Sequence, residues 1–208
     1  MSQTLYIHPD NPQTRLINQA VEIINKGGIV IYPTDSSYAI GCHIDNKAAR
    51  DRIRRIRRLD DKHHFTLMCR DLSEISKYGI VDNINYRLLK NLTPGAYTFI
   101  LKATREVPRR LQNPKRKTIG LRIPENNIAH ALLETLDEPL MSSTLIMPGE
   151  DLPLNDPYQI ELALDKHVEL IIDGGFCGYE PTTVIDLMAA PPEILRKGKG
   201  SVDWLIQH

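Results

Sequence analysis

The sequence predicts a single α/β domain built around one twisted sheet. Short apolar segments alternate with segments whose apolar residues recur every three or four positions, the pattern of strands interleaved with helices. The 208 residues, 41% of them hydrophobic, are enough to bury one core and few for two comfortable domains. We therefore expect residues 1–208 to form one domain.

The first half of the chain opens with an extended segment and a helix. Asn11 and Pro12 are residue types typical of an N-cap and a first helical position, and the glycine pair 27–28 provides a stop. Asp45 or Asn46 has the side chain to cap a second helix. After the first helix we expect strands over 28–34 and 64–69, and helices over 47–59, 71–79 and 83–92.

The second half keeps the same alternation. We expect strands over 96–104, 118–124, 140–144, 168–173 and 182–187, and helices over 126–136 and 158–167. Short connections near Gly28, Pro94 and Thr183 leave room for antiparallel neighbours. The sheet is therefore expected to be mixed rather than all parallel.

Charge and composition exclude some classes of protein. Lysine plus arginine and aspartate plus glutamate number 26 each, so net charge gives no argument for nucleic acid or membrane binding. No apolar run approaches the ~18 residues of a membrane span, and the first ten residues lack the pattern of a signal peptide. We expect a cytoplasmic protein without a membrane partner.

The cysteines and histidines do not have the spacing of metal ligands. Cys42, Cys69 and Cys177 form no pair at such spacing, and His63 and His64 are adjacent, so on a strand they face opposite ways. We expect the cysteines to be small core residues in a reducing compartment, and no structural metal.

A dense run of arginines lies on the second expected helix. Six arginines fall within residues 50–58, and Arg54, Arg57 and Arg58 share a face by helical spacing. This run is either a phosphate-binding surface or a solvated helix face, and the sequence leaves both interpretations open. Three consecutive cations at 115–117 are more typical of an exposed loop.

Hydroxyl-rich segments mark the ends of expected strands. They are residues 34–37, 142–144 and 182–183. In α/β sheets such ends present ligand sites, and hydroxyls with free backbone N–H groups bind carboxylates or phosphates. Each segment alone is equally well a turn or a cap. No glycine-rich phosphate loop and no nucleophile elbow is present.

Two arginines are candidates for binding an anion. Arg122 interrupts an apolar strand, where a charge is costly unless it is paired or lines a ligand cleft. Arg196 poses the same question near the end of the chain. Asp35, Asp173 and Asp186 are candidate partners for either arginine.

Taken together, these segments resemble one family in collinear order. The segments are GGIVIYPTDSSYAIGC, TPGAYTFIL, TIGLRIP, LMSST, TTVIDL and EILRKG. They are similar to the signatures of the YrdC, Sua5 and YciO family, and RRLDDKHHFTLMCRD looks most like its YciO branch. The resemblance covers nearly the whole chain. It implies a twisted, open, mixed α/β sheet of the YrdC/RibB type with a concave, basic face.

The resemblance also implies a function. Family members condense ATP, L-threonine and bicarbonate to threonylcarbamoyl-AMP and pyrophosphate, a nucleotidyltransferase-type reaction that serves threonylcarbamoyladenosine modification of tRNA. It implies ATP with nucleotide-bound Mg²⁺ and no structural metal. The residues that match the nucleotide and threonine pocket are Thr34, Arg57, Arg122, Ser142, Thr182 and Arg196. No individual residue is implied as a catalytic acid, base or nucleophile.

Two departures from the family pattern imply a weak or altered activity. The K-x-R motif of the synthases has no lysine here; the nearest fits are 55–57 or 57–59. Their S-x-N motif is also incomplete, because Ile146 stands where the asparagine would be. Isoleucine has no hydrogen-bond donor, and losing one donor to a phosphate costs roughly two to three orders of magnitude in rate.

Two other functions remain open. A non-catalytic module could bind double-stranded RNA or tRNA through shape and phosphate contacts. Its surface would comprise Arg54, Arg55, Arg58, Lys115, Arg116 and Lys117. A hydrolase that uses a hydroxyl nucleophile such as Ser142 is disfavoured, because no histidine has an obvious place beside any candidate serine.

Overall fold

The computed structural model describes residues 1–205 and contains one ten-stranded sheet. The strands are β1 (Gln3–Tyr6), β2 (Val30–Tyr32), β3 (Ala39–His43), β4 (Thr66–Met68), β5 (Tyr97–Lys102), β6 (Thr118–Arg122), β7 (Leu140–Thr144), β8 (Leu170–Asp173), β9 (Thr183–Asp186) and β10 (Glu193–Arg196). The helices are α1 (Thr14–Asn25), α2 (Lys47–Arg57), α3 (Leu72–Tyr78), α4 (Asn83–Leu92), α5 (Asn127–Leu136) and α6 (Pro157–Leu164). Short 3₁₀ turns cover Arg109–Leu111 and Asp203–Leu205.

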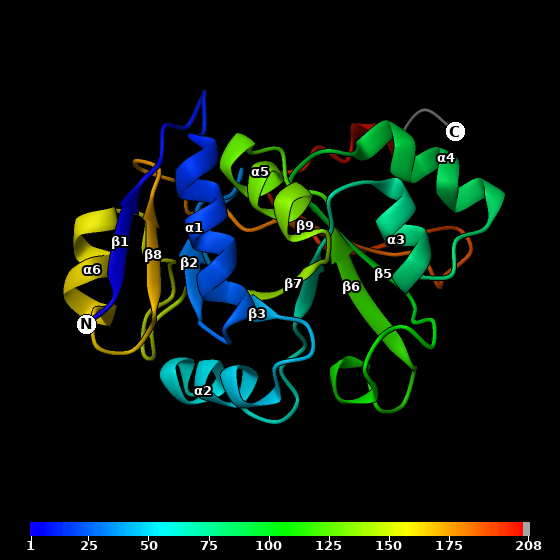
Figure 1. Cartoon of the computed structure of the whole chain (residues 1–208). Coiled ribbons are helices and arrows are strands. Elements are labelled where there is room, and N and C mark those ends of the chain that lie inside the picture. Colours follow the sequence, from blue (N-terminus) through cyan, green and yellow to red (C-terminus); the bar gives the residue numbers. More distant parts are fainter. Residues whose placement is uncertain (206–208) are drawn as a thin grey trace.

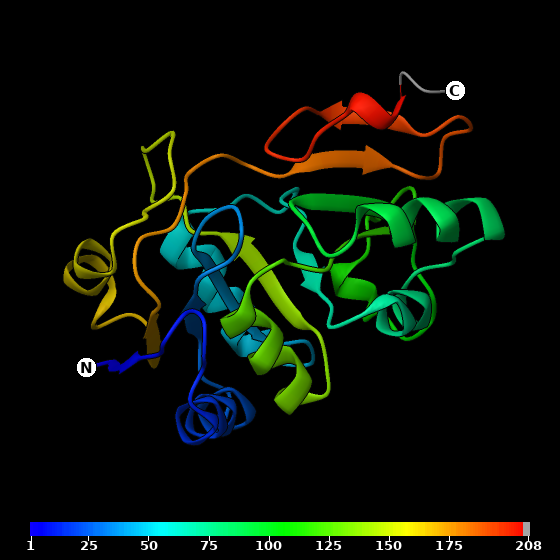
Figure 2. The same cartoon turned by 90° about the horizontal axis from the view of Figure 1, so that it is seen from above.

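The sheet is open and mixed, as the sequence predicted. Its strand order is β1-β8-β2-β3-β7-β4-β6-β5-β9-β10. The pairs β1·β8, β2·β8, β4·β6 and β5·β9 are parallel, and the other neighbours are antiparallel. Figures 1 and 2 show the helices grouped around this strongly twisted sheet.

Helices cover the sheet on both faces. Buried residues of α1 and α5 pack together against β1, β2, β3, β7 and β8 in one apolar cluster. A second cluster contains residues of α2, α3, α4 and α6 with the opposite face of β2, β3, β7 and β8, and with β4, β5, β6 and β9. The alternation of side chains along each strand therefore divides the core into two layers.

The ends of two helices test the expected caps. Asn46 caps α2, and its Oδ1 accepts from the Ala49 N–H at 2.9 Å. The first helix begins at Thr14 rather than at Pro12, so the expected start was wrong. The His8 ring nitrogen Nδ1 accepts the N–H groups of Asp10 and Asn11, each at 3.2 Å. These contacts hold the segment before Thr14 in a turn.

The hydroxyl-rich segment joins two strands that form a hairpin. The expected strand over 28–34 ends at Tyr32, and residues 33–38 turn the chain back into β3, which pairs antiparallel with β2. β3 was not predicted as a strand. Among the described residues, no helix is both long and apolar enough to cross a membrane.

Candidate functional site

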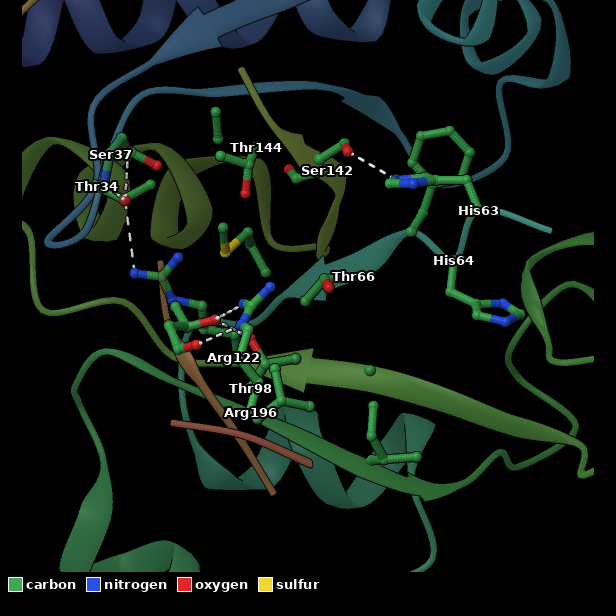
Figure 3. A pocket seen from close by; sticks show the side chains of 18 residues that line it. Thr34, Ser37, His63, His64, Thr66, Thr98, Arg122, Ser142, Thr144 and Arg196 are labelled. Atoms are coloured by element: carbon green, nitrogen blue, oxygen red, sulfur yellow. Dashed lines mark hydrogen bonds between the residues drawn. The ribbon is translucent and has the colours of Figure 1, made fainter. Parts of the chain in front are cut away.

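A cavity of about 240 Å³ lies on the sheet and collects side chains from distant parts of the sequence (Figure 3). The lining residues come from the 33–38 turn, the segment before β4, and strands β3 to β7, β9 and β10. Among them are Thr34, Arg122, Ser142, Thr182 and Arg196. Five of the six pocket residues expected from the sequence therefore line one cavity.

Thr34 organises the turn between β2 and β3. Its Oγ1 accepts the backbone N–H groups of Ser36 and Ser37, each at 3.2 Å, and donates to the Ser37 carbonyl at 2.6 Å. All three residues are buried. The turn thus satisfies its own polar groups while holding Thr34 against the cavity.

Arg122 is a buried cation that is partly paired. Its guanidinium forms an ion pair with Asp35, and its Nη2 lies 3.5 Å from Thr34 Oγ1. Burial lowers the pKa of Arg122, and the Asp35 carboxylate opposes that shift. The buried Nε has no hydrogen-bond partner among the described residues. An unpaired buried donor is costly, so Arg122 retains one unused donor at the edge of the cavity.

Arg196 brings a second cation to the cavity from β10. Its Nε donates to the Thr182 carbonyl at 3.0 Å, and its Nη2 donates to Thr182 Oγ1 at 3.2 Å. Thr182 Oγ1 in turn lies 2.9 Å from Thr98 Oγ1. Within residues 1–205, no carboxylate forms an ion pair with Arg196, so its charge is available to an anion.

Ser142 is fixed by a buried tyrosine. Its Oγ lies 2.6 Å from the Tyr32 hydroxyl. Burial raises the pKa of the Tyr32 phenol, which therefore stays protonated. This contact anchors β7 to β2 across β3 at the inner wall of the cavity.

Arg57 lies behind the cavity wall and connects the two segments that depart from the family motifs. Its Nε donates to the Ile146 carbonyl at 2.8 Å, and its Nη1 donates to Ser143 Oγ. Burial lowers the pKa of Arg57 to about 10, so the side chain remains a cation at neutral pH. The side chain of Ile146 does not belong to the cavity lining.

Sequence reasoning missed two histidines of the cavity. His63 and His64 both line it, and His63 Nε2 lies 2.9 Å from Ser143 Oγ. The expectation that no histidine lies beside a candidate serine was therefore wrong for Ser143. The pair is 80 positions apart in the chain, and the only signal in the sequence was the adjacent histidines just before a strand.

The basic residues proposed for RNA do not form one free surface. Arg54 Nη1 bonds to the Asp60 carbonyl, and its guanidinium lies 5.2 Å from the centroid of the Phe65 ring. Arg58 ends α2 in a left-handed conformation, so it leaves the helical face that it was expected to share with Arg54 and Arg57. Arg55 and Arg58 line a groove between α2 and the turn after α6.

The basic loop is partly neutralised by a carboxylate. Arg116 is paired with Asp186 at 2.6 Å. Lys115 and Lys117 are exposed on the same loop. Of the cations suggested for nucleic acid, the exposed ones are therefore divided between the α2 groove and this loop.

All three cysteines belong to the apolar core or pack against it. Cys42 and Cys69 are buried, and Cys177 is partly buried. In the part of the chain that the structure describes, no group of three or more His, Cys, Asp or Glu side chains is placed to hold a metal ion.

Comparisons with known proteins show the family and the fold of this chain. A family model described as telomere recombination, for Sua5, YciO and YrdC proteins, matches residues 22–198. The protein YciO of Escherichia coli K12 is 61% identical over 202 residues, 97% of this chain and 98% of that protein. Its crystal structure superposes with a TM-score of 0.93 over 97% of this chain and 98% of that chain.

More distant relatives have names that state an activity or a ligand. The threonylcarbamoyl-AMP synthase of Coxiella burnetii (Nine Mile phase I) is 27% identical over 187 residues, 88% of this chain and 97% of that protein. The crystal structure of P. abyssi Sua5 complexed with L-threonine is 23% identical, with a TM-score of 0.90 over 98% of this chain and 60% of that chain. At 23% identity, the likeness to P. abyssi Sua5 shows a shared fold and no more.

Proposed function

Because this chain belongs to the Sua5, YciO and YrdC family, we propose that its cavity binds L-threonine and the phosphates of ATP with Mg²⁺. The proposed reaction condenses these with bicarbonate to give threonylcarbamoyl-AMP, pyrophosphate and water, at a low rate. The threonine nitrogen attacks the bicarbonate carbon and water leaves. The carbamate oxygen then attacks the α-phosphorus, and pyrophosphate leaves.

One observation carries this proposal: two arginines and three hydroxyl residues expected in the pocket converge on a single cavity. Arg122 has an unused Nε donor, and Arg196 has no carboxylate partner among the described side chains. A guanidinium matches the planar carboxylate of an amino acid and the oxygens of a phosphate. The two cations thus suit a substrate that carries both groups.

The size of the cavity indicates how the substrates would divide it. At about 240 Å³ it is below the ~300–1,000 Å³ of sites that enclose a drug-sized ligand. It is therefore suited to the whole of a threonine molecule but only part of a nucleotide. We assign the enclosed part to threonine and the open rim near Arg196 to phosphate.

Catalysis at such a site would come mainly from position and charge. The threonine amine and bicarbonate need to be held together, and the cations offset the negative charge that gathers at the α-phosphorus. Mg²⁺ would be bound mainly by the nucleotide, because it prefers phosphate oxygens and water. No side chain is assigned a proton transfer in this reaction.

The two motif departures provide the reason for a low rate. The guanidinium of Arg57 is held by Ser143 and by the Ile146 carbonyl, so it is less free to meet a phosphate than a lysine ammonium would be. Ile146 also lacks the donor of an asparagine. Each lost contact in the transition state costs roughly two to three orders of magnitude.

Titration calorimetry tests the binding step of this proposal. We expect L-threonine to bind wild-type protein, and Arg122→Lys to bind it more weakly by about tenfold, since the lysine keeps the charge but not the two-pronged donor. Arg196→Gln is expected to weaken ATP·Mg²⁺, while the neighbouring exposed Lys197→Gln serves as its control. The proposal fails if neither threonine nor ATP·Mg²⁺ binds the wild-type protein at millimolar concentration.

Binding of double-stranded RNA or tRNA is the second candidate function. It is favoured by the exposure of Arg55, Arg58, Lys115 and Lys117. Two results would support this function. The affinity for RNA would fall steeply with salt, and it would be lost when Arg55 and Arg58 are changed to glutamine. This function also predicts that changes at Thr34 leave the affinity for RNA unchanged. It is rejected if no RNA binds at low salt.

A further inference from the structure

A serine and a histidine lie within hydrogen-bond distance of each other at the cavity. Ser143, on β7, is 8% exposed, and its Oγ is 2.9 Å from Nε2 of His63. Figure 3 shows His63 on the opposite side of the cavity from Thr34 and Arg122. The pair therefore lies apart from the residues assigned to the threonine carboxylate.

The contacts of Ser143 set the direction of its hydrogen bonds. Arg57 Nη1 can only donate, so Ser143 Oγ accepts that bond. The hydroxyl proton of Ser143 is then free to be donated to His63 Nε2, provided that this nitrogen is unprotonated. Burial, with the nearby cations Arg57 and Arg54, lowers the pKa of His63 to about 4. The ring is therefore neutral at pH 7 and has one nitrogen that accepts a proton.

Packing, rather than a carboxylate, orients the histidine ring. It makes a T-shaped contact with the ring of Phe65, with the centroids 5.3 Å apart. Within residues 1–205, no acidic side chain forms an ion pair with His63. In place of the aspartate of a Ser-His-Asp triad, this arrangement has an aromatic ring beside the histidine. It keeps the hydrogen bond between serine and histidine that activates the hydroxyl.

The cations around the pair act on both of its members. Positive charge makes His63 a weaker base, and it also stabilises the alkoxide that Ser143 would become, to which Arg57 already donates. Proton transfer depends on the difference between the two pKa values, which changes less than either value alone. The same charges favour an anionic substrate and the negative charge of a tetrahedral intermediate.

We propose that Ser143 is a nucleophile with His63 as its general base, and that the cavity hydrolyses mixed anhydrides of small carboxylic acids with phosphate. Oγ attacks the carbonyl carbon, its proton passes to Nε2, and the bond to the phosphate oxygen breaks with phosphate as the leaving group. The proton on Nε2 is released to phosphate or solvent. Arg196 lines the same cavity and has no carboxylate partner among the described residues, so it suits such a leaving group.

The second half of the reaction restores the enzyme. Water attacks the carbonyl carbon of the acyl-serine and gives a proton to Nε2. The bond to Oγ breaks, Oγ takes the proton from Nε2, and the carboxylic acid is released. The sum is an acyl phosphate and water giving a carboxylic acid and phosphate, with no ATP, metal or redox partner required. This activity therefore does not depend on threonylcarbamoyl-AMP synthesis.

Labelling with a fluorophosphonate, which phosphonylates activated serines, tests the nucleophile directly. We expect one label per wild-type chain, located at Ser143 by peptide mass mapping and absent from Ser143→Ala. His63→Gln keeps a hydrogen-bond acceptor near Ser143 but takes up no proton, and should label at least about 100-fold more slowly. Ser73→Ala and His130→Gln, at exposed positions outside the cavity, should label as wild type does.

Hydrolysis of acetyl phosphate, followed as phosphate release without ATP or threonine, tests the substrate class with the same five proteins. We expect turnover by wild type and both control variants, and loss of at least about 99% of it in Ser143→Ala and His63→Gln. Absence of label from Ser143, labelling of His63→Gln at the wild-type rate, or absence of acetyl phosphate turnover would overturn the proposal. If Ser143→Ala fails to fold, the peptide map of wild type and the rate of His63→Gln still decide it.

Discussion

At the residue scale, Arg122 and Asp35 form an ion pair that is almost fully withdrawn from water. Their side chains are 6% and 10% exposed. The other Asp35 oxygen accepts the Glu125 N–H at 3.0 Å, so the carboxylate is bound on both sides. The sequence left three aspartates open as partners, because the choice depends on the 33–38 turn meeting a strand 87 positions away.

Removing both members of this pair should cost much less than the sum of the two single removals. Arg122→Ala leaves a buried carboxylate and Asp35→Ala leaves a buried guanidinium, and each should lower the free energy of unfolding by about 3–5 kcal/mol. The double variant leaves neither charge, so its loss should be well below the sum of the two. Urea unfolding of the four proteins measures this. Additive losses would mean that the two side chains do not interact.

His63 should make stability depend on pH in a defined window. Its pKa is lowered to about 4 by burial first, then by Arg57 and Arg54 from α2 and His64 from its own loop, while Asp60 raises it. The unfolded chain binds this proton near pH 6.5, so the folded state loses stability as pH falls from about 6.5 to about 4. Above pH 6.5 the contribution is constant.

The variant His63→Gln removes this titrating side chain. Its stability should therefore depend less on pH between about 6.5 and about 4. Relative to wild type, its free energy of unfolding should rise by about 1–3 kcal/mol between pH 7 and pH 4. Other titrating groups are common to both proteins and cancel in the difference, and His130→Gln controls for loss of a histidine as such. A difference that stays constant with pH would show that His63 takes up protons equally in both states.

At the scale of elements, the sequence predicted types better than boundaries. The helix over 83–92 was predicted at its observed bounds from its residue pattern, and the structure adds Asp82 as its N-cap. Its cap accepts the Asn85 N–H at 2.7 Å. β3 was missed because polar residues 34–37 interrupt the apolar pattern, and pairing with β2 and β7 fixes it as a strand. Such pairing is a tertiary effect that a local pattern does not contain.

The C-terminal end of α2 offers a test at this scale. Arg58 has φ 51° and ψ 44°, a left-handed conformation that favours glycine. Arg58→Gly should raise the free energy of unfolding by about 0.5–1 kcal/mol. Asp137, at the end of α5, has φ 57° but also an ion pair with Arg70 at 2.6 Å.

In the matched variant Asp137→Gly, the free energy of unfolding should therefore rise less than in Arg58→Gly, because this variant also loses the ion pair with Arg70. Thermal and urea unfolding of both variants measures the difference. A loss of stability in Arg58→Gly would mean that contacts of the arginine outweigh its backbone strain, and that its side chain is fixed rather than free in the groove.

At the scale of the whole molecule, the cavity exists only because the chain folds back on itself. The turn at 33–38 and residues 196–199 meet beside it, where Lys199 Nζ donates to the Asp35 carbonyl. Thr182 and Arg196 reach the cavity because β9 pairs with β5, and β10 with β9. Collinear motifs predicted five of the residues that line this cavity, whereas the pairing of His63 with Ser143 required the fold.

Product formation is the decisive measurement for threonylcarbamoyl-AMP synthesis by this protein. The protein would be incubated with ATP, Mg²⁺, bicarbonate and L-threonine, with pyrophosphate and threonylcarbamoyl-AMP measured together, for wild type, Arg122→Lys and Ile146→Asn. We expect slow formation of both products in equal amounts, a lower rate in Arg122→Lys, and a higher rate in Ile146→Asn, which restores a hydrogen-bond donor. If none of the three proteins forms threonylcarbamoyl-AMP, the proposed synthase activity is wrong.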